Sequence, residues 1–243
     1  MPNTREAPRD SHGVDDYLEA IYELEEEGTR AVQASVAERL GVSRASVSEQ
    51  VNRMARMGLI KADGRTLRLT SHGYAIAEDA VRRHRMAERF LVDVLKMPWH
   101  TAHEEAQRFQ GAISEEIERR IMRLMGGPAT CPHGNPIPGT GARMRRDLKP
   151  LNEFAAGKAV VLERMTEDVE LDTKALRYFE EYGLVPGARL RIVARAPDGT
   201  LTLQVKRRRA TLGPRLADNL WVRSPAAGRR PEGNGAGRRA ASS

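Results

Sequence analysis

Two histidines and a glutamate near the middle of the chain have the residue types and spacing of a metal site. His84 and Glu88 lie four residues apart, so on a helix they share one face, and His103 follows on the next predicted helix. Imidazole and carboxylate together bind divalent ions such as Mn, Fe, Co, Ni or Zn. The alternative is a buried histidine with one local hydrogen bond and a glutamate paired with Arg85 or Arg89.

A second potential pair of ligands, Cys131 and His133, lies in the segment CPHGNPIPG. Thiolate and imidazole bind transition metals, but two ligands in a Pro- and Gly-rich loop are weak evidence. The favoured interpretation of residues 126–141 is therefore a structural linker or an ordered loop. Cys131 is the only cysteine, so the chain cannot form an internal disulfide, which agrees with a reducing compartment.

The chain is long enough for two or three small domains. Its 40% hydrophobic and 30% charged residues fit a globular protein, and no apolar run approaches the roughly 18 residues of a membrane span. Residues 1–13 lack the apolar core of a signal peptide and are predicted to be disordered. We therefore expect a cytoplasmic protein without membrane contact.

The first predicted helix carries two acidic residues that could join the cluster of His84, Glu88 and His103. It spans residues 14–27 and ends at Gly28. Asp16 and Glu19 near its start suit the positive end of the helix dipole, and they could also be ligands.

Helices over 33–40 and 44–57 follow, joined by the turn Gly41-Val42-Ser43, which is the helix-turn-helix pattern.

A hairpin follows the second of these helices. Residues 59–61 and 66–69 alternate in polarity around Asp63-Gly64, which predicts a wing. Residues 30–70 hold eight Lys or Arg against three Asp or Glu, so we expect binding to double-stranded DNA. The alternative is a winged helix used for protein contacts. The predicted DNA-facing residues are Ser43, Arg44, Ala45, Ser46, Ser48, Glu49, Gln50, Arg53 and Arg65.

The remaining chain predicts a helical region and then a strand-rich one. Helices are expected over 73–95, capped by Ser71, over 98–113 and over 114–125, with more apolar residues than a monomer needs, so they predict a homodimer seam. Short strands over 159–165, 190–195, 200–205 and 210–212, with a helix over 173–181, predict a small barrel. The fold class is mainly α with a small all-β domain.

The motifs in this order resemble the DtxR/MntR family of metal-dependent transcriptional repressors. They are DYLEAIYELEEEG, VAERLGVSRASVSEQVNRM, RRHRMAERFL, HEEA and GNPIPG, and the later MTEDVELD and EYGLVPGARLRIV resemble its SH3-like (FeoA-type) domain. The resemblance implies a homodimer that binds a palindromic operator when loaded with Mn(II) or Fe(II). It implies a winged helix-turn-helix domain (14–73), a helical dimerisation and metal-binding domain (74–141) and an SH3-like domain (150–223).

The same resemblance implies two metal positions. The ancillary position falls on His84, Glu88, His103, Glu167 and Glu170. The primary position falls on Asp16, Glu19, Gln107, Gln110 and Gly111, where the family has Cys or Glu, then Glu, then His, at the last three positions. Glutamine is neutral and glycine has no side chain, so this site loses charge and its imidazole. We therefore hypothesise one ion per subunit, at the ancillary position.

The leading interpretation is a metal-sensing, DNA-binding repressor of metal-homeostasis genes rather than an enzyme. A metal-independent winged-helix regulator is the first alternative, because the primary position is degraded. A metallohydrolase is the second, but five protein ligands would close the open coordination position that hydrolysis needs. The SH3-like domain could bind proline-rich peptides or only deliver Glu167 and Glu170. The basic tail, residues 224–243, is predicted to be disordered.

Overall fold

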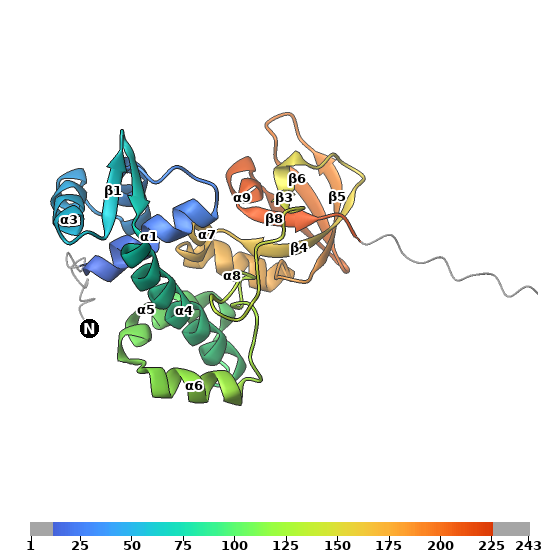
Figure 1. The fold of residues 1–243 in the computed structure, drawn as a ribbon. Helices are drawn as coiled ribbons and strands as arrows, with labels where there is room; N and C mark the ends of the chain where they lie inside the picture. Colours follow the sequence, from blue (N-terminus) through green and yellow to red (C-terminus); the bar gives the residue numbers. More distant parts are fainter. Residues whose placement is uncertain (1–11, 226–243) are drawn as a thin grey trace, which may run out of the picture.

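The computed structural model describes residues 12–225, so the disorder predicted for the two ends lies largely outside the described residues. An N-terminal helical head, a central helical region and a C-terminal barrel follow one another along the chain (Figure 1). The predicted class, mainly α with a small all-β domain, is confirmed.

The head consists of α1 (Val14–Glu26), α2 (Gln33–Leu40), α3 (Arg44–Arg56) and the hairpin β1 (Ile60–Asp63) and β2 (Thr66–Leu69). Gly41 has φ +65° between α2 and α3, a conformation that favours glycine. The Ser43 hydroxyl caps α3 by accepting from the Ser46 N–H at 3.1 Å. Buried apolar side chains including Leu18, Ile21, Val36, Val47 and Met54 hold the helices together. The predicted helix-turn-helix and wing are confirmed.

The long helix α4 (Ser71–Asp93) runs from the head into the central region. Its cap is Thr70 rather than the predicted Ser71, because the Thr70 hydroxyl accepts from the Gly73 N–H at 3.1 Å. Gly73 packs directly on the hairpin, where an added Cβ would lie 2.0 Å from the Leu59 carbonyl oxygen. The head and α4 are therefore closely joined.

The predicted helix over 98–113 is broken into three pieces. A 3₁₀ turn (Trp99–Thr101) precedes α5 (Ala102–Phe109), and a second 3₁₀ turn (Gln110–Ala112) follows it. The last helix of this region is α6 (Glu115–Leu124).

Residues 126–141 form an ordered loop, which is one of the two expectations for this segment, and residues 131–138 are mostly buried. The Cys131 N–H donates to the Asn135 carbonyl at 2.8 Å, and His133 and Asn135 are fully buried. Gly134 has φ +94°, and an added Cβ would lie 2.0 Å from the Glu163 carbonyl oxygen. This close approach fixes the segment against the barrel.

The barrel is a six-stranded antiparallel sheet in the order β3-β8-β4-β5-β6-β7. Buried residues from several strands and helices, such as Leu162, Phe179, Ile192 and Leu220, form its core. The predicted small barrel is confirmed, but the sequence analysis did not predict β3, β8, α7 or α9. Its strands are β3 (Lys149–Pro150), β4 (Ala159–Met165), β5 (Arg189–Arg195), β6 (Leu201–Val205), β7 (Arg208–Leu212) and β8 (Leu220–Arg223), and its helices are α7 (Glu167–Glu170), α8 (Thr173–Tyr182) and α9 (Pro214–Asp218).

Candidate metal centre and nucleic-acid interface

His84, Glu88 and His103 lie together between α4 and α5, as their spacing predicts. His84 Nε2 is 3.3 Å from Glu88 Oε1 and 3.1 Å from His103 Nδ1, and His103 Nδ1 is 3.2 Å from Glu88 Oε1. His84 and Glu88 are almost completely buried. Three potential ligand atoms therefore converge at one point inside the molecule.

The short helix α7 brings two carboxylates from the barrel to the same point. Glu170 Oε2 lies 3.6 Å and Glu167 Oε2 lies 4.0 Å from His103 Nδ1. Both glutamates are 2% exposed. The structure thus places together the five residues that the family resemblance implies for the ancillary position.

Cys131 and His133 join this cluster, contrary to the linker interpretation of their segment. His133 Nδ1 is 2.8 Å from Glu170 Oε2 and 3.4 Å from Glu88 Oε1. The ligand atoms of Cys131, His133, Glu88 and Glu170 all lie within 4.8 Å of one another. The sequence shows Cys131 and His133 two residues apart, but only the fold shows that their segment packs against Glu88.

The local pairing of Glu88 with an arginine does not occur. Arg85 binds both carboxylate oxygens of Glu26, at 3.0 and 2.6 Å, and Glu167 Oε1 at 3.2 Å. The Arg89 Nε donates to the Thr130 carbonyl at 3.0 Å. The two guanidinium groups therefore leave Glu88 facing the histidines.

The pKa values of several side chains in the cluster are shifted strongly from their usual ranges. Burial alone would raise the pKa of Glu88, but the neighbouring His133, His84 and His103 outweigh burial and hold it well below its usual range. Burial alone would lower the pKa of His103, yet Glu170 and Glu88 raise it well above its usual range. Burial raises the pKa of the Cys131 thiol to about 12. Charges on neighbouring side chains, rather than burial, therefore set the direction of the pKa shifts of Glu88 and His103.

The donor set fits a divalent transition metal. Glu88 Oε2, Glu167 Oε2, Glu170 Oε2 and both ring nitrogens of His133 are buried without a hydrogen bond of acceptable geometry. Buried polar atoms normally have partners, so these atoms call for a ligand. The donor separations of 2.8 to 3.6 Å also match the spacing of about 3 Å between adjacent ligands when each bond is roughly 2.1 Å long.

The residues at the primary position are arranged differently. The Gln107 Nε2 lies 3.4 Å from Asp16 Oδ1, and the Gln110 Nε2 donates to Glu19 Oε2 at 3.3 Å. Gly111 brings no side chain. Of these residues, Asp16, Glu19 and Gln107 line a cavity of about 520 Å³ between α1, α2, α5 and α7. Asp16 and Glu19 therefore each contact a neutral glutamine amide. The family resemblance implies charged metal ligands at the positions of these glutamines.

Asp16 and Glu19 have separate local roles. Asp16 Oδ2 accepts from the Gly13 N–H at 2.8 Å, which supports the start of α1. Glu19 is 5% exposed, and burial raises its pKa above the usual range. Asp16 and Glu19 do not belong to any of the potential ligand groups found in residues 12–225.

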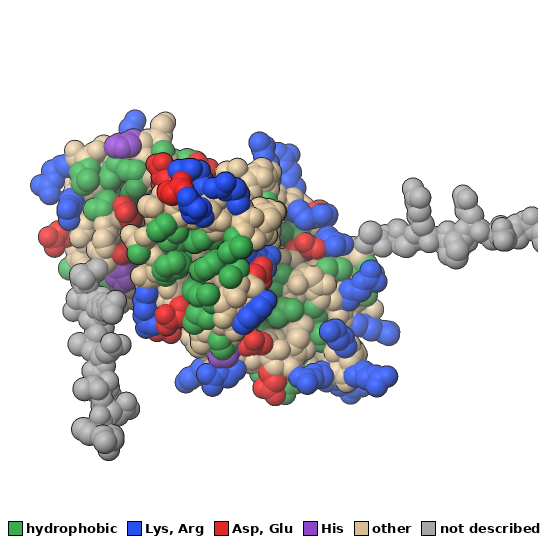
Figure 2. Space-filling view, turned by 90° about the horizontal axis from the view of Figure 1, so that it is seen from below, with side chains coloured by type: hydrophobic (Ala, Val, Ile, Leu, Met, Phe, Trp, Pro, Cys, Tyr) green, Lys and Arg blue, Asp and Glu red, His purple; other side chains and the backbone are tan. Residues whose placement is uncertain are grey.

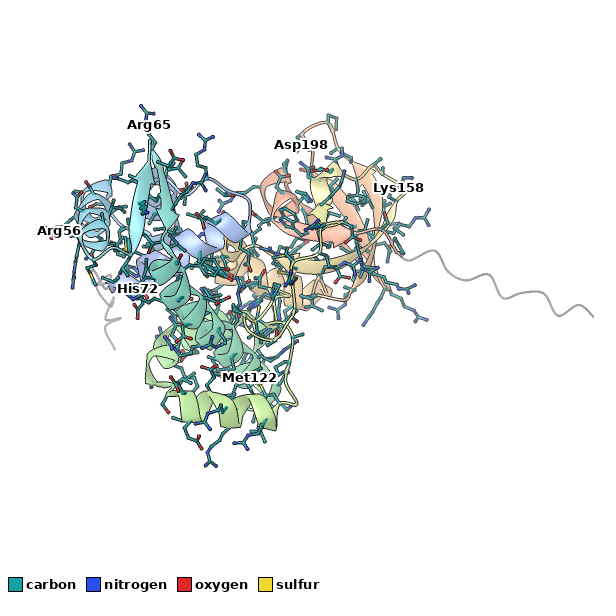
Figure 3. The ribbon with its side chains drawn as sticks, viewed as in Figure 1. Arg56, Arg65, His72, Met122, Lys158 and Asp198 are labelled. Carbon is teal, nitrogen blue, oxygen red and sulfur yellow. The ribbon has the colours of Figure 1, made fainter. Side chains whose placement is uncertain are left out.

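The expected DNA-facing residues lie on an open surface of the head. Ser43, Arg44, Ser46, Glu49 and Arg53 are exposed on α3, and Ala45 is exposed beside them, whereas Ser48 and Gln50 are half-buried. Arg65 projects from the tip of the wing and Arg56 from the outer side of α3 (Figure 3). Arg44, Arg53 and Arg65 have no ion pair among the residues that the structure describes. They remain available to phosphates.

Arg39 of α2 connects this head to α7. Its guanidinium donates to Glu27 Oε2 at 2.7 Å and to Asp168 Oδ1 at 3.0 Å. Glu27 Oε1 in turn accepts from the Glu167 N–H at 2.9 Å. The peptide that carries the potential ligands Glu167 and Glu170 is therefore bonded directly to the helix-turn-helix.

The central helices leave an apolar face uncovered. Figure 2 shows hydrophobic side chains gathered in the middle of the face seen from below. Exposed apolar residues of this region include Val94, Leu95, Ile117 and Leu124, beside the half-buried Phe90 and Met122. Such a face suits contact with another protein surface. No helix within residues 12–225 is long and apolar enough to cross a membrane.

Three family models cover most of the chain. The N-terminal DNA-binding domain of iron-dependent repressors matches residues 11–66, and their metal-binding and dimerisation domain matches residues 70–139. The FeoA domain matches residues 149–224.

Characterised relatives and solved structures agree with these models. The iron-dependent repressor IdeR of Mycobacterium tuberculosis is 42% identical over 200 residues, which cover 78% of this chain and 86% of the relative. The diphtheria toxin repressor of Corynebacterium jeikeium is 34% identical, with 73% and 83% covered. A structure of a manganese-dependent transcriptional repressor with manganese is 30% identical, with a TM-score of 0.79, and covers 88% of this chain and all of that one.

Proposed function

Because the chain belongs to the iron-dependent repressor family and is a metal-dependent DNA-binding regulator, we propose that it represses metal-homeostasis genes when Mn(II) or Fe(II) fills the cluster around Glu88 and Glu170. These two carboxylates each belong to two of the potential ligand groups. The proposal rests on one observation. Several buried donor atoms of the cluster lack a hydrogen-bond partner, and α7, which supplies two of the donor residues, is hydrogen-bonded to the head.

We propose one ion per subunit in this cluster. His84, Glu88, His103, His133 and Glu170 supply the closest donors, and Cys131 and Glu167 adjoin them. A bound divalent ion would supply positive charge that offsets the buried carboxylates. The residues themselves hold α4, α5, α7 and the 126–141 segment in one relative position. The mixed donors suit both Mn(II) and Fe(II).

We further propose that two subunits pair through the apolar face of α4 and α6 and present two heads to a palindromic operator. A twofold dimer matches a twofold symmetric site on DNA. Arg44 and the exposed residues at the start of α3 would face base edges, while Arg53 and Arg65 would contact phosphates. A protein that acts on chromosomal DNA would reside in the cytoplasm, without a membrane partner.

The test is fluorescence anisotropy of labelled DNA from the protein's own promoter region. We expect binding with Mn(II), or with Fe(II) under anaerobic conditions, to be at least tenfold tighter than with a chelator. A duplex of shuffled sequence serves as the control for nonspecific binding, which phosphate contacts alone produce. Equal, specific binding with and without metal would favour the metal-independent regulator instead.

We propose no catalytic role for the cluster. Three overlapping groups of three or four protein donors share Glu88, His103 and Glu170. Hydrolysis by a metal ion needs an open coordination position for water. Release of product from ester or phosphate substrates by the metal-loaded protein would contradict this proposal.

A further inference from the structure

Gln110 occupies the point where α1, α4 and α5 meet. Its Oε1 lies 2.7 Å from His84 Nδ1, and its Nε2 lies 3.3 Å from Glu19 Oε2. One side-chain amide therefore contacts both a potential metal ligand on α4 and a buried carboxylate on the first helix of the head. Gln110 is the first residue of the 3₁₀ turn that follows α5.

The two contacts fix the direction of the amide. A carboxylate oxygen accepts from an amide N–H, so the nitrogen of Gln110 faces Glu19 Oε2. The oxygen of Gln110 then faces His84 Nδ1, and that ring nitrogen must carry the proton. The reversed amide would place oxygen against the carboxylate and would repel it.

This arrangement selects one tautomer of His84. With the proton on Nδ1, the lone pair is on Nε2, which lies 3.3 Å from Glu88 Oε1 and 3.1 Å from His103 Nδ1. The free lone pair therefore points into the ligand cluster. With the other tautomer, a proton would occupy the direction from which a metal binds.

The nitrogen of the Gln110 amide contacts the head through Glu19. Glu19 Oε1 is buried without a hydrogen bond, so Gln110 supplies the side-chain hydrogen bond that Glu19 makes among the described residues. Glu19 projects from the middle of α1, which packs against both α2 and α4. A change in the position of His84 would therefore reach α1 through one residue.

We propose that Gln110 is a positioning residue that keeps His84 in its ligand-ready tautomer and transmits the position of His84 to Glu19 on α1. It performs this task in the region where the family resemblance expects a second ion. The proposal rests on the proposed function, because it assumes that the cluster binds metal and that the metal favours DNA binding.

Three single variants separate the two contacts. Gln110→Leu removes both hydrogen bonds with little change in volume, and Glu19→Leu removes only the bond to α1. Gln107→Leu is the comparator, because Gln107 contacts Asp16 on α1 without touching His84. Thermal unfolding of each variant establishes that it is folded.

The first readout is the tautomer of His84 in the metal-free protein, at a pH at which its imidazole is neutral. Proton-nitrogen correlation spectra of ¹⁵N-histidine-labelled protein distinguish Nδ1–H from Nε2–H. We expect the Nδ1–H form of His84 in the wild type, in Glu19→Leu and in Gln107→Leu. We expect a mixture in Gln110→Leu. The Nε2–H form in the wild type would overturn the proposal, as would an unchanged His84 spectrum in folded Gln110→Leu.

The second readout is the ratio of DNA dissociation constants with chelator and with saturating Mn(II). We expect Gln110→Leu and Glu19→Leu to lower this ratio at least tenfold, and Gln107→Leu to lower it less than twofold. A wild-type ratio of one would contradict the proposed function itself. A large wild-type ratio that Gln110→Leu leaves unchanged would contradict only the role of Gln110.

A reversed pair provides a rescue test. Gln110→Glu retains an acceptor for His84 but places two carboxylates together, so the ratio should fall. Gln110→Glu combined with Glu19→Gln restores a donor opposite the acceptor, and the ratio should recover to within about threefold of the wild type. Failure of the double variant to exceed Gln110→Glu would show that the link does not depend on this hydrogen bond.

Discussion

The two sides of α5 show how the same helices can carry a metal centre on one side and a hydrogen-bonded contact on the other. Around Glu88, donor atoms converge and several lack partners. Around Glu19, two glutamine amides meet the acids of α1 directly. Buried carboxylates need either a cation or a hydrogen-bond donor, and our proposal assigns the first solution to the Glu88 region and the second to the Glu19 region.

The largest expected difference between the regions is in metal affinity. Glu88→Gln removes a carboxylate that belongs to two ligand groups, and we expect Mn(II) affinity to fall by more than about 100-fold, because loss of even an outer partner of a metal ligand costs 10–100-fold. Glu19→Gln should lower it less than tenfold. Competition with a fluorescent chelator measures both. Equal losses would show that the two regions do not differ as we propose.

A second prediction concerns adding a metal site to the region around Glu19. The combined variant Gln107→Glu, Gln110→Glu and Gly111→His restores the residue types that the family resemblance expects. A Cβ at Gly111 meets no atom within 4 Å, so histidine fits there. We expect calorimetric titration with Mn(II) to show a second equivalent per subunit. A folded variant that still binds one equivalent would contradict our charge argument.

A smaller effect is expected at Cys131. Thiolate is a soft ligand, so Cys131→Ser should lower Cd(II) and Zn(II) affinity by about 10–100-fold and Mn(II) affinity by less than about tenfold. Parallel chelator competitions with the three ions provide the measurement. Unchanged affinity for all three would place Cys131 outside the metal shell and would leave its thiol a packing role only.

The sequence was most informative where residues share one regular element. His84 and Glu88 are four apart on α4, so helical spacing alone predicts their contact. The wing follows similarly from Asp63-Gly64 between alternating segments. The cap of α4 was misplaced by one residue because Thr70 and Ser71 both offer a hydroxyl group, and the sequence does not show which one faces Gly73.

Contacts between distant segments were harder to predict. His133 reaches Glu88 because Gly134 approaches the Glu163 carbonyl closely, which depends on how the segment packs on β4. Glu167 and Glu170 were assigned through the resemblance, and local pattern gave no sign of α7. The contact of Gln110 with His84 depends on the 3₁₀ turn that ends α5, and the sequence favoured a continuous helix there.

The most direct test of the central claim is the number of metal ions per subunit in the purified complex with operator DNA. Elemental analysis after gel filtration in Mn(II)-buffered solution gives this number together with the protein concentration. We predict one Mn per subunit, and less than 0.2 in the Glu88→Gln protein treated identically. Two ions per subunit in the wild type, or none in a complex that still binds its operator specifically, would contradict the claim.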